Sequence, residues 1–245
     1  MQSLIKTFRF QKIRKHVLSS LVDSTLYFAA PPTLNDPHDC QINIDAAITR
    51  AISKSTGKRK DLLVQILELG LVSLVQEDLP NMGVCCFSLK LDNSLMWSHY
   101  ADSHKGVCLY YEIPTAFLSP NQIHAWAPVI YRNNPLTHWL VNELDKDLDA
   151  GEASIEITKC VLTMKSRAWS YEKEGRLFRH SSGLVELPRD FLKQVCFGLN
   201  TPDDDKRLII HIVSTCYENV EFVKMIRDSE ADTGVCPVIE TLPTA

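Results

Sequence analysis

Apolar residues alternate with polar ones over short stretches spread along the chain, and this period of two predicts strands. The first is "LIKTFRF" at 4–10, and a second at 24–32 ends at two consecutive prolines, Pro31 and Pro32. Short apolar runs bounded by turn residues predict the others. These lie at 81–89, 106–113, 127–131, 175–180, 194–200, 220–228 and 234–240.

Apolar residues three and four apart predict helices between several of these strands. Residues 12–22 and 56–79 each carry one apolar face on this spacing. Asn93 and Ser94 are natural N-cap residues for a short helix that runs to Tyr100. Further helices are predicted at 137–164, with a break near Gly151, at 188–194 and at 202–216.

Strands and helices alternate too irregularly for a doubly wound parallel sheet. The sequence contains no internal repeat, no low-complexity segment and no linker rich in proline or glycine. A chain of 245 residues is long enough to bury a substantial core. We therefore predict one α+β domain over residues 1–245, with a mixed or mainly antiparallel sheet and helices inserted between its strands.

The composition is that of a globular protein, with 45% hydrophobic and 23% charged residues and a formal net charge of −4. It lacks the strong basic excess of a dedicated nucleic-acid binder. Basic residues crowd 6–15 and 50–60 and acidic ones crowd 143–156, which is more typical of solvated faces than of an anion-binding surface. No run approaches the ~18 apolar residues of a membrane span, and no apolar signal segment is present at the N-terminus. We expect no membrane partner and a cytoplasmic location.

The eight cysteines are scattered, mostly within apolar runs such as "GVCCFSL" at 83–89. They include no CxxC pair and no other spacing typical of a zinc site. Buried, reduced thiols fit this pattern better than disulfides. We also expect no metal, because no cluster of His, Asp and Glu has a recognisable ligand spacing.

A first group of candidate functional residues follows the predicted strand at 24–32. Asn35, Asp36, His38 and Asp39 lie in a turn-rich loop, and loops often present functional side chains. A carboxylate and an imidazole there can face a pocket. Alternatively, Asn35 and Asp36 bond to their own backbone in Asx-turns and serve only the loop.

A second group occupies "MWSHYADSHKGVCLYYEI" at 96–113. On a helix, Trp97 and Tyr100 share one face, either as core residues or as a platform on which a ring can stack. His104 follows in the turn before the next strand. It can bind an anion, exchange a proton or cap the end of the helix.

A third group, "KSRAWSYEKEGRLFR" at 165–179, surrounds Glu172 and Glu174 with basic residues. If this run is extended, Glu172, Glu174 and Arg176 point to the same face. Two carboxylates close together raise one pKa and favour acid–base chemistry, unless a cation neutralises them. The alternative is a salt-bridge network on a solvated face.

These stretches, in this order, resemble a large bacterial family known only as domain of unknown function 2971. One departure is Gly175, where such sequences usually carry a bulky aromatic residue. The resemblance covers most of the chain, and the family name implies no activity. The matching residues are "FRF" at 8–10, "LYFAAPPTLNDPHDC" at 26–40, the second group at 96–113 and "AWSYEKEGRLF" at 168–178.

The layout is also similar, more weakly, to ADP-ribosyltransferase folds. This similarity implies that Arg9 holds a phosphate of NAD, that Trp97 or Tyr100 stacks on the nicotinamide, and that Glu174 polarises a ribose hydroxyl. Such chemistry needs a fixed carboxylate and a pocket that excludes water. The similarity therefore implies a transferase or glycohydrolase with NAD or another nucleotide as its substrate, in a toxin or phage-defence setting.

Two functional hypotheses place the three groups around one pocket. In the first, Glu174, Glu172 and His104 are the catalytic residues of an enzyme, and the nucleotide contacts Arg9, Asn35, Asp36, Trp97, Tyr100 and Arg176. In the second, a non-catalytic module binds a nucleotide, a phosphate group or the end of a nucleic acid through Arg9, His104, Lys105 and Arg176. A third hypothesis makes the motifs structural and leaves the helices between them to a protein partner.

Overall fold

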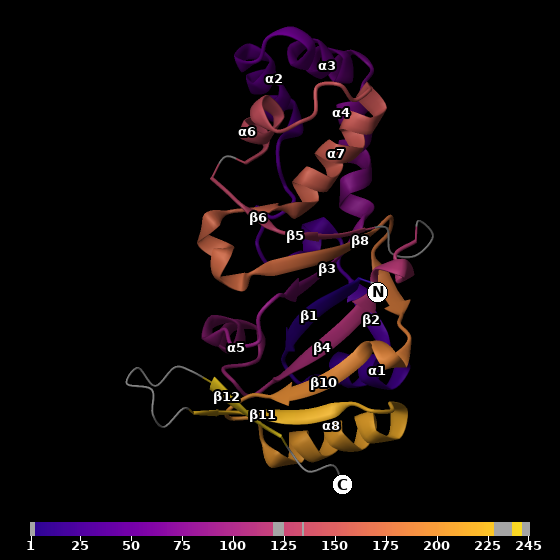
Figure 1. The fold of residues 1–245 in the computed structure, drawn as a ribbon, viewed down its shortest axis with the longest axis vertical. Helices are drawn as coiled ribbons and strands as arrows, with labels where there is room; N and C mark the ends of the chain where they lie inside the picture. The colour runs from indigo at the N-terminus through magenta and orange to yellow at the C-terminus, as the bar shows by residue number, and fades with distance from the viewer. Residues whose placement is uncertain (1–2, 120–124, 134, 228–236, 242–245) are drawn as a thin grey trace.

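A long, twisted sheet runs through the middle of the molecule and carries helices at both ends (Figure 1). The computed structural model describes residues 3–119, 125–133, 135–227 and 237–241. Within these residues, the main sheet has the strand order β12-β11-β10-β4-β1-β3-β8-β5. Its strands are β1 (Leu4–Gln11), β3 (Gly83–Ser88), β4 (Val107–Pro114), β5 (Ala125–Pro128), β8 (Glu174–Arg179), β10 (Leu192–Phe197), β11 (Glu221–Arg227) and β12 (Pro237–Thr241).

Neighbouring strands of this sheet are antiparallel, except that β10 and β11 run parallel in the part of the chain described. The predicted α+β class, with a mixed and mainly antiparallel sheet, is therefore confirmed. β1 pairs with β4 along its whole length. In contrast, the described pairing of β1 with β3 consists of the bridge between Phe8 and Ser88.

Short ladders and helices complete the described fold. β2 (Thr25–Phe28) pairs with β9 (Gly183–Glu186), and β6 (Ile130–Tyr131) pairs with β7 (Met164–Lys165). The α-helices are α1 (Lys15–Asp23), α2 (Ile44–Lys54), α3 (Gly57–Glu68), α4 (Leu71–Asp78), α5 (Ser94–Tyr100), α6 (Pro135–Asn142), α7 (Ala150–Thr163) and α8 (Asp203–Cys216).

The two faces of the sheet have separate cores. On the face that we call the α1/α8 face, Leu21 of α1 and Ile209 of α8 pack with strand residues such as Leu109. On the opposite face, the α5 face, Trp97 packs with Phe10 of β1. Burial of these large apolar side chains is the main force that holds both layers to the sheet.

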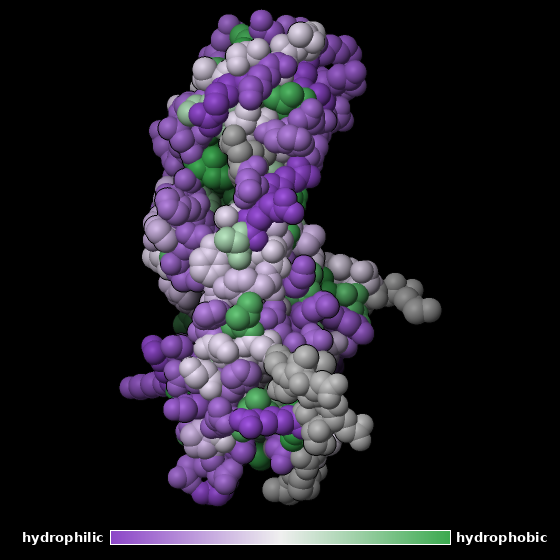
Figure 2. Space-filling view, turned by 90° about the vertical axis from the view of Figure 1, so that its left-hand side faces the viewer, coloured by the Kyte–Doolittle hydropathy of each residue, from purple (hydrophilic) through white to green (hydrophobic). Residues whose placement is uncertain are grey.

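A third core fills the helical end of the molecule. It joins α2, α3, α4, α6 and α7 to the sheet through Val84 of β3 and Phe178 of β8. On the side shown in Figure 2, hydrophilic residues cover most of this end. The helices therefore bury their apolar faces against one another and expose their polar faces, as amphipathic helices do.

Strand alternation decides which face each side chain of β8 reaches. Leu177 packs in the α1/α8 core, whereas Phe178 packs in the helical core on the other side. Glu174 and Arg176 are in step with Phe178. Their side chains therefore point away from the α1/α8 face.

Most of the predicted elements are present, but two long helices are divided. The helix predicted at 56–79 is α3 and α4, because Gly70 between them adopts a left-handed φ of 68°. The helix predicted at 137–164 is α6 and α7, and its interruption at 143–149 lies before Gly151.

Other predictions of secondary structure were wrong or incomplete. The helix predicted at 188–194 is a 3-10 turn (Arg189–Phe191) followed by β10. α2 and β9 were not predicted, although Asn43 caps α2 through its side chain. Residues 234–236 of the last predicted strand lie outside the described residues.

Gly175 makes room for a side chain from the neighbouring strand. A Cβ atom at this position would lie 2.3 Å from Cη2 of Trp126 in β5. Trp126 thus supplies aromatic bulk beside Gly175.

The structure describes seven of the eight cysteines, and the prediction of buried thiols holds for five of them. All seven are free, five are buried, and Cys86 and Cys216 are partly buried. Cys236 lies outside the described residues. In a separate finding, no described helix has the length and apolar character needed to cross a membrane.

Candidate functional site

A buried lysine and three carboxylates meet where β8 begins. Lys165 Nζ lies 2.6 Å from Glu172 Oε2, 3.1 Å from Glu174 Oε2 and 3.5 Å from Asp39 Oδ2. These four residues are each at most 5% exposed. Charged groups this deep are stable only when they are paired and hydrogen-bonded.

Arg176 holds two of these carboxylates from the protein interior. Its Nε lies 2.7 Å from Glu174 Oε1, and its terminal nitrogens lie 2.9 and 2.6 Å from the two oxygens of Asp39. It also donates to the carbonyl of Leu162 at 2.7 Å. The planar guanidinium suits such two-point contacts and fixes both carboxylates in place.

A local turn brings Glu172 next to Glu174. Glu172 ends a 3-10 helix (Arg167–Glu172), and Lys173 then adopts a left-handed φ of 47° before β8 starts. The predicted common face assumed that this run is extended, and the structure shows that it is not. Both carboxylates nevertheless reach Lys165. Ser88 secures the turn by donating to the Glu172 carbonyl at 2.8 Å.

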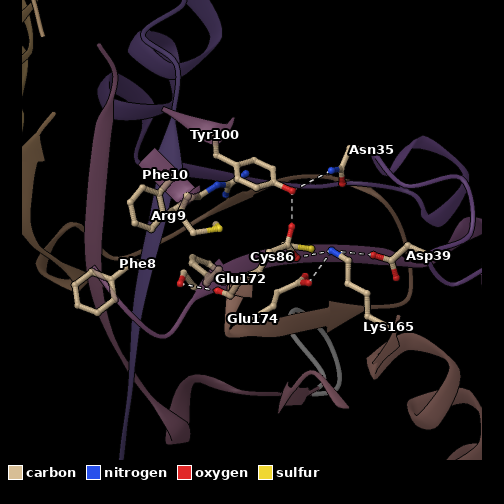
Figure 3. Close-up of a pocket in the computed structure, with 13 residues that line it drawn as sticks. Phe8, Arg9, Phe10, Asn35, Asp39, Cys86, Tyr100, Lys165, Glu172 and Glu174 are labelled. Carbon is tan, nitrogen blue, oxygen red and sulfur yellow. Dashed lines mark hydrogen bonds and ion pairs between the residues drawn. The ribbon is translucent and has the colours of Figure 1, made fainter. Parts of the chain in front are cut away.

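Tyr100 connects this cluster to the loop after β2. Its hydroxyl donates to Glu172 Oε1 at 2.5 Å and accepts from Asn35 Nδ2 at 3.0 Å (Figure 3). Tyr100 is the last residue of α5, whose start is fixed by the Asn93 side chain, which accepts from two backbone N–H groups. Asn35, Tyr100 and Glu172 thus form a hydrogen-bonded chain.

This chain and the ion pairs border a small cavity of about 100 Å³ on the α5 face (Figure 3). Glu172, Glu174 and Lys165 supply its charged side, and Tyr100 and Asn35 supply further polar groups. The rest of the wall is mostly apolar. The remaining residues around the cavity are Phe8, Arg9, Phe10, Asp39, Cys86, Phe87, Ser88 and Met96.

The two glutamates have opposite pKa shifts. Burial raises the pKa of Glu172 more than Lys165 and the Tyr100 hydroxyl lower it. Burial also opposes ionisation of Glu174, but Arg176 and then Lys165 outweigh it and lower the pKa of Glu174 to about 2. Burial disfavours a positive charge on Lys165 as well, yet Glu174 and Glu172 raise its pKa above the usual value.

The charge count agrees with these directions. Lys165 and Arg176 carry two positive charges, and Asp39 and Glu174 balance them when both are ionised. Glu172 is the additional carboxylate. The cluster is neutral when Glu172 is protonated and carries one negative charge when Glu172 is ionised, so Glu172 is the group able to exchange a proton.

Five of the nine predicted site residues border the cavity. Arg9 is one of them, but its guanidinium does not lie beside the carboxylates. The Arg9 guanidinium donates to Cys85 Sγ at 3.1 Å and lies 5.9 Å from the centre of the Phe87 ring. Cys85 and Phe87 belong to the core of the α1/α8 face. The structure therefore brings together the polar groups of Asn35, Tyr100, Glu172 and Glu174 and leaves the Arg9 guanidinium on the other face.

Trp97 and His104 do not line the cavity. Trp97 is fully buried, donates to the Leu91 carbonyl at 2.9 Å and meets Phe10 edge-on, so its ring faces cannot take a substrate. The His104 ring stacks 6.1 Å from that of Trp97, and burial lowers its pKa. His104 also ends a run of three left-handed residues with φ from 51° to 66°, which makes the turn into β4.

Asp36 and Arg176 also lie outside the wall of this cavity. Asp36 Oδ1 accepts from the His38 backbone N–H at 2.9 Å, so it serves the loop as an Asx-turn. It borders a separate cavity of about 300 Å³ together with Arg132 and Lys165. Arg176 acts behind the wall, where it positions Glu174.

Lys165 and Asp39 are central to the cluster, but neither was assigned a catalytic or binding role from the sequence, although Asp39 belongs to the first group of candidate residues. Lys165 directly follows "CVLTM" at 160–164, and a cation at the end of an apolar run is a signal of a buried, paired charge. The signal for Asp39 was its place in the turn-rich loop after the strand at 24–32, which did not indicate its partners. Among the described residues, no group of three His, Cys, Asp or Glu has a geometry that could hold a metal ion.

Comparison with models of known protein families gives a match. A family model described as "Protein of unknown function (DUF2971)" matches residues 96–177. The match confirms the resemblance to this family over a segment that includes Tyr100, Lys165, Glu172 and Glu174. No curated protein and no solved structure matches the chain. The similarity to ADP-ribosyltransferase folds therefore stays a prediction.

Proposed function

We propose that the cavity is the active site of an enzyme that cleaves or transfers at a glycosidic bond of a nucleotide, with NAD as the first substrate to test. Glu172 is its acting carboxylate. In this proposal the enzyme is a bacterial cytoplasmic protein in a toxin or phage-defence setting. The role assigned to Glu174 by the resemblance passes to its neighbour.

The separated pKa values of the two glutamates carry this proposal. Where neighbouring carboxyl groups have environments that push their pKa values apart, one serves as the proton-exchanging group and the other stays ionised. Glu172 has the raised pKa, borders the cavity and is held by Tyr100. Both oxygens of Glu174 are paired with cations, Arg176 and Lys165, whereas one oxygen of Glu172 is paired with Lys165 and the other accepts from the neutral Tyr100 hydroxyl.

The charge of the cluster favours a cationic reacting centre over an anionic one. With Glu172 ionised, the buried cluster carries one net negative charge. Cleavage of a glycosidic bond passes through an oxocarbenium-like transition state, which is positively charged. A carboxylate fixed beside the bond stabilises this charge as it develops.

The chemistry in the proposed site breaks one bond, forms one bond and transfers one proton. Glu172 accepts a hydrogen bond from a ribose hydroxyl, and the bond between the ribose carbon and the nicotinamide nitrogen breaks. Nicotinamide leaves with the electron pair. Water or an acceptor nucleophile then adds to the ribose carbon, and its proton passes to Glu172 and on to solvent.

The size of the cavity limits how much of the substrate enters it. Its volume of about 100 Å³ is well below the several hundred Å³ of ordinary ligand pockets. In the proposal, only the reacting end of the nucleotide enters, and Tyr100 and Phe8 flank it. The rest of the nucleotide lies outside the cavity.

The alternative is a non-catalytic module that binds a nucleotide, a phosphate group or a nucleic-acid end. One observation favours it: the oxygens of Glu174 are taken up in ion pairs with Arg176 and Lys165. The cations proposed for phosphate binding, however, do not line this cavity, apart from the edge formed by Arg9. The enzyme hypothesis therefore has the better support at this site.

The test is the release of nicotinamide from NAD by purified protein, followed by chromatography. ADP-ribose, nucleosides and nucleotides are assayed in parallel. We expect turnover by the wild-type protein and a loss of about 100-fold or more in Glu172→Gln, the range for a missing acid–base group. Glu186→Gln, on the solvent side of β9, is the matched control and keeps full activity.

Two results contradict the proposal. The first is no turnover of any of these substrates by folded protein. The second is turnover that Glu172→Gln leaves unchanged. A substrate that raises the thermal midpoint of the wild-type protein without being consumed supports the binding module instead, because a ligand selective for the native state stabilises it by mass action.

A further inference from the structure

A larger cavity lies on the α1/α8 face of the sheet. It is a groove of about 840 Å³ between α1, β1, β2 and β4. This volume is within the usual range of small-molecule sites. The groove borders Arg9, as the cavity at Glu172 does, but on the opposite face, where the guanidinium lies.

The Arg9 guanidinium has neutral partners in this groove. It donates to Cys85 Sγ at 3.1 Å and to the Tyr27 carbonyl at 3.4 Å. Among the described residues, no carboxylate lies within 4 Å of it. Arg9 is partly buried. A guanidinium has five N–H donors and keeps its charge at all ordinary pH values, so this charge is uncompensated and several donors remain for a ligand.

The rest of the groove combines a polar rim with apolar walls. Lys15 and His16 of α1 stand at the rim, and Asp23 is the one carboxylate among the described lining residues. Tyr27 and Tyr111 add aromatic surface. Its apolar walls are formed by Val17, Leu21, Leu26, Leu109 and Leu184.

We propose that this groove binds a small molecule that carries an oxyanion on an aromatic body. Arg9 takes the oxyanion through two-point hydrogen bonds, and the apolar walls cover the ring. A guanidinium matches the geometry of phosphate and carboxylate, and a few placed polar groups in an apolar pocket are the usual pattern of a ligand site. This proposal is independent of the reaction proposed at Glu172.

The charges at the groove argue against other ligand classes. A cationic ligand would meet the uncompensated charge of Arg9 and would be repelled. A fully apolar ligand would bury that charge without a partner, which costs free energy. A neutral polar ligand leaves the charge uncompensated, whereas an oxyanion both neutralises it and satisfies its donors.

The test is titration calorimetry with matched pairs of probes. Adenosine 5′-monophosphate is paired with adenosine, and phenyl phosphate with phenol. We expect at least one phosphate to bind the wild-type protein at least tenfold more tightly than its neutral partner. Arg9→Gln removes this difference. Lys15→Gln, at the rim, weakens binding less, and Glu172→Gln leaves it unchanged because Glu172 lies on the other face.

A second variant tests the location without touching the charge. Ser20→Tyr adds bulk to the groove from α1 and should abolish binding while the far-ultraviolet circular dichroism stays that of the wild type. Inorganic phosphate is titrated as a competitor. If inorganic phosphate binds as tightly as the aromatic phosphates, the ring contributes nothing to binding. That result would overturn the aromatic part of the proposal.

The proposal fails under three further results. One is that neither phosphate binds folded wild-type protein. Another is that the neutral partners bind as tightly as the phosphates. The third is that Arg9→Gln, with unchanged secondary structure, binds as the wild type does. If Glu172→Gln removes binding and Arg9→Gln does not, the ligand occupies the other cavity.

Discussion

The cavity at Glu172 and the groove at Arg9 lie on opposite faces of the same sheet and differ in almost every property. The first is small and bordered by a cluster with an excess of carboxylates, and the second is wide and has an uncompensated cation. Phe8 and Phe10, the neighbours of Arg9 in the chain, border the first. Residues that are neighbours in the sequence of a strand therefore need not belong to the same site, because successive side chains alternate between the two faces of the sheet.

The contrast is clearest between two arginines. Arg176 is fully buried and contacts two carboxylates, whereas Arg9 is partly buried and contacts a thiol and a carbonyl. The first is part of the internal structure. The Arg9 guanidinium retains N–H donors and a charge that a ligand can use. Burial together with the identity of the partners separates a structural cation from a binding one.

The largest predicted effect comes from Arg176→Gln. It leaves Glu174 and Asp39 buried without their main partner, and removal of one member of a buried ion pair costs about 3–5 kcal/mol. We expect a loss of this size in the free energy of unfolding, measured by urea denaturation. Arg9→Gln, which orphans no carboxylate, should cost about 1 kcal/mol or less.

Arg167→Gln is the control for the first comparison, because Arg167 is exposed on the neighbouring 3-10 helix. It should leave the unfolding midpoint unchanged. Equal losses from Arg176→Gln and Arg9→Gln would show that the two arginines do not differ in the way the structure indicates.

The next effect distinguishes the two glutamates by pH. The pKa of Glu174 is lowered in the folded protein to about 2, from an ordinary value near 4.5. Its contribution to stability is therefore present above about pH 4.5 and is lost as the pH falls toward 2. That shift corresponds to about 3 kcal/mol at neutral pH. Glu174→Gln should lose a free energy of this order and flatten the acid limb of the stability profile.

Glu172→Gln should show the opposite dependence. The pKa of Glu172 is raised in the folded protein, so its contribution is full below about pH 4.5 and is lost as the pH rises through the folded value. The variant should therefore gain stability relative to the wild type as the pH rises. Urea denaturation at a series of pH values checks both variants. Profiles that change with pH in the same direction would contradict the assignment of Glu172 as the proton-exchanging group.

Local patterns in the sequence were enough to predict the fold class and most of the elements. The period of two identified β1 and the period of 3.6 identified α8, because each buries one face along its length. Short apolar runs identified β4 and β8, which are buried on both faces over much of their length. The break at Gly70 was missed, whereas the break predicted near Gly151 is present at 143–149. The helix predicted at 188–194 failed because a Pro at the start of an apolar run also suits a 3-10 turn before a strand.

The candidate site was only partly predictable for a related reason. Local sequence placed Glu172, Glu174 and Tyr100 in conspicuous motifs, and the structure brings their side chains together. The local sequence did not show that Lys165 joins these side chains, because that contact needs α7 to end beside the turn at Lys173. Nor did it show which glutamate would be neutralised, since Arg176 and Asp39 meet only in the folded chain.

The smallest predicted effect concerns the hydrogen bond from Tyr100 to Glu172. The hydroxyl stabilises the ionised carboxylate, so Tyr100→Phe should raise the pKa of Glu172 further. The loss of one such bond should cost about 1–2 kcal/mol of stability. Carbon-13 NMR titration of the glutamate carboxyl groups measures the pKa, and the signal absent in Glu172→Gln identifies the residue. Tyr27→Phe, in the groove on the other face, should leave this titration unchanged. If Tyr100→Phe also leaves it unchanged, the chain from Asn35 to Glu172 does not control the proton, and the two cavities differ in size and charge alone.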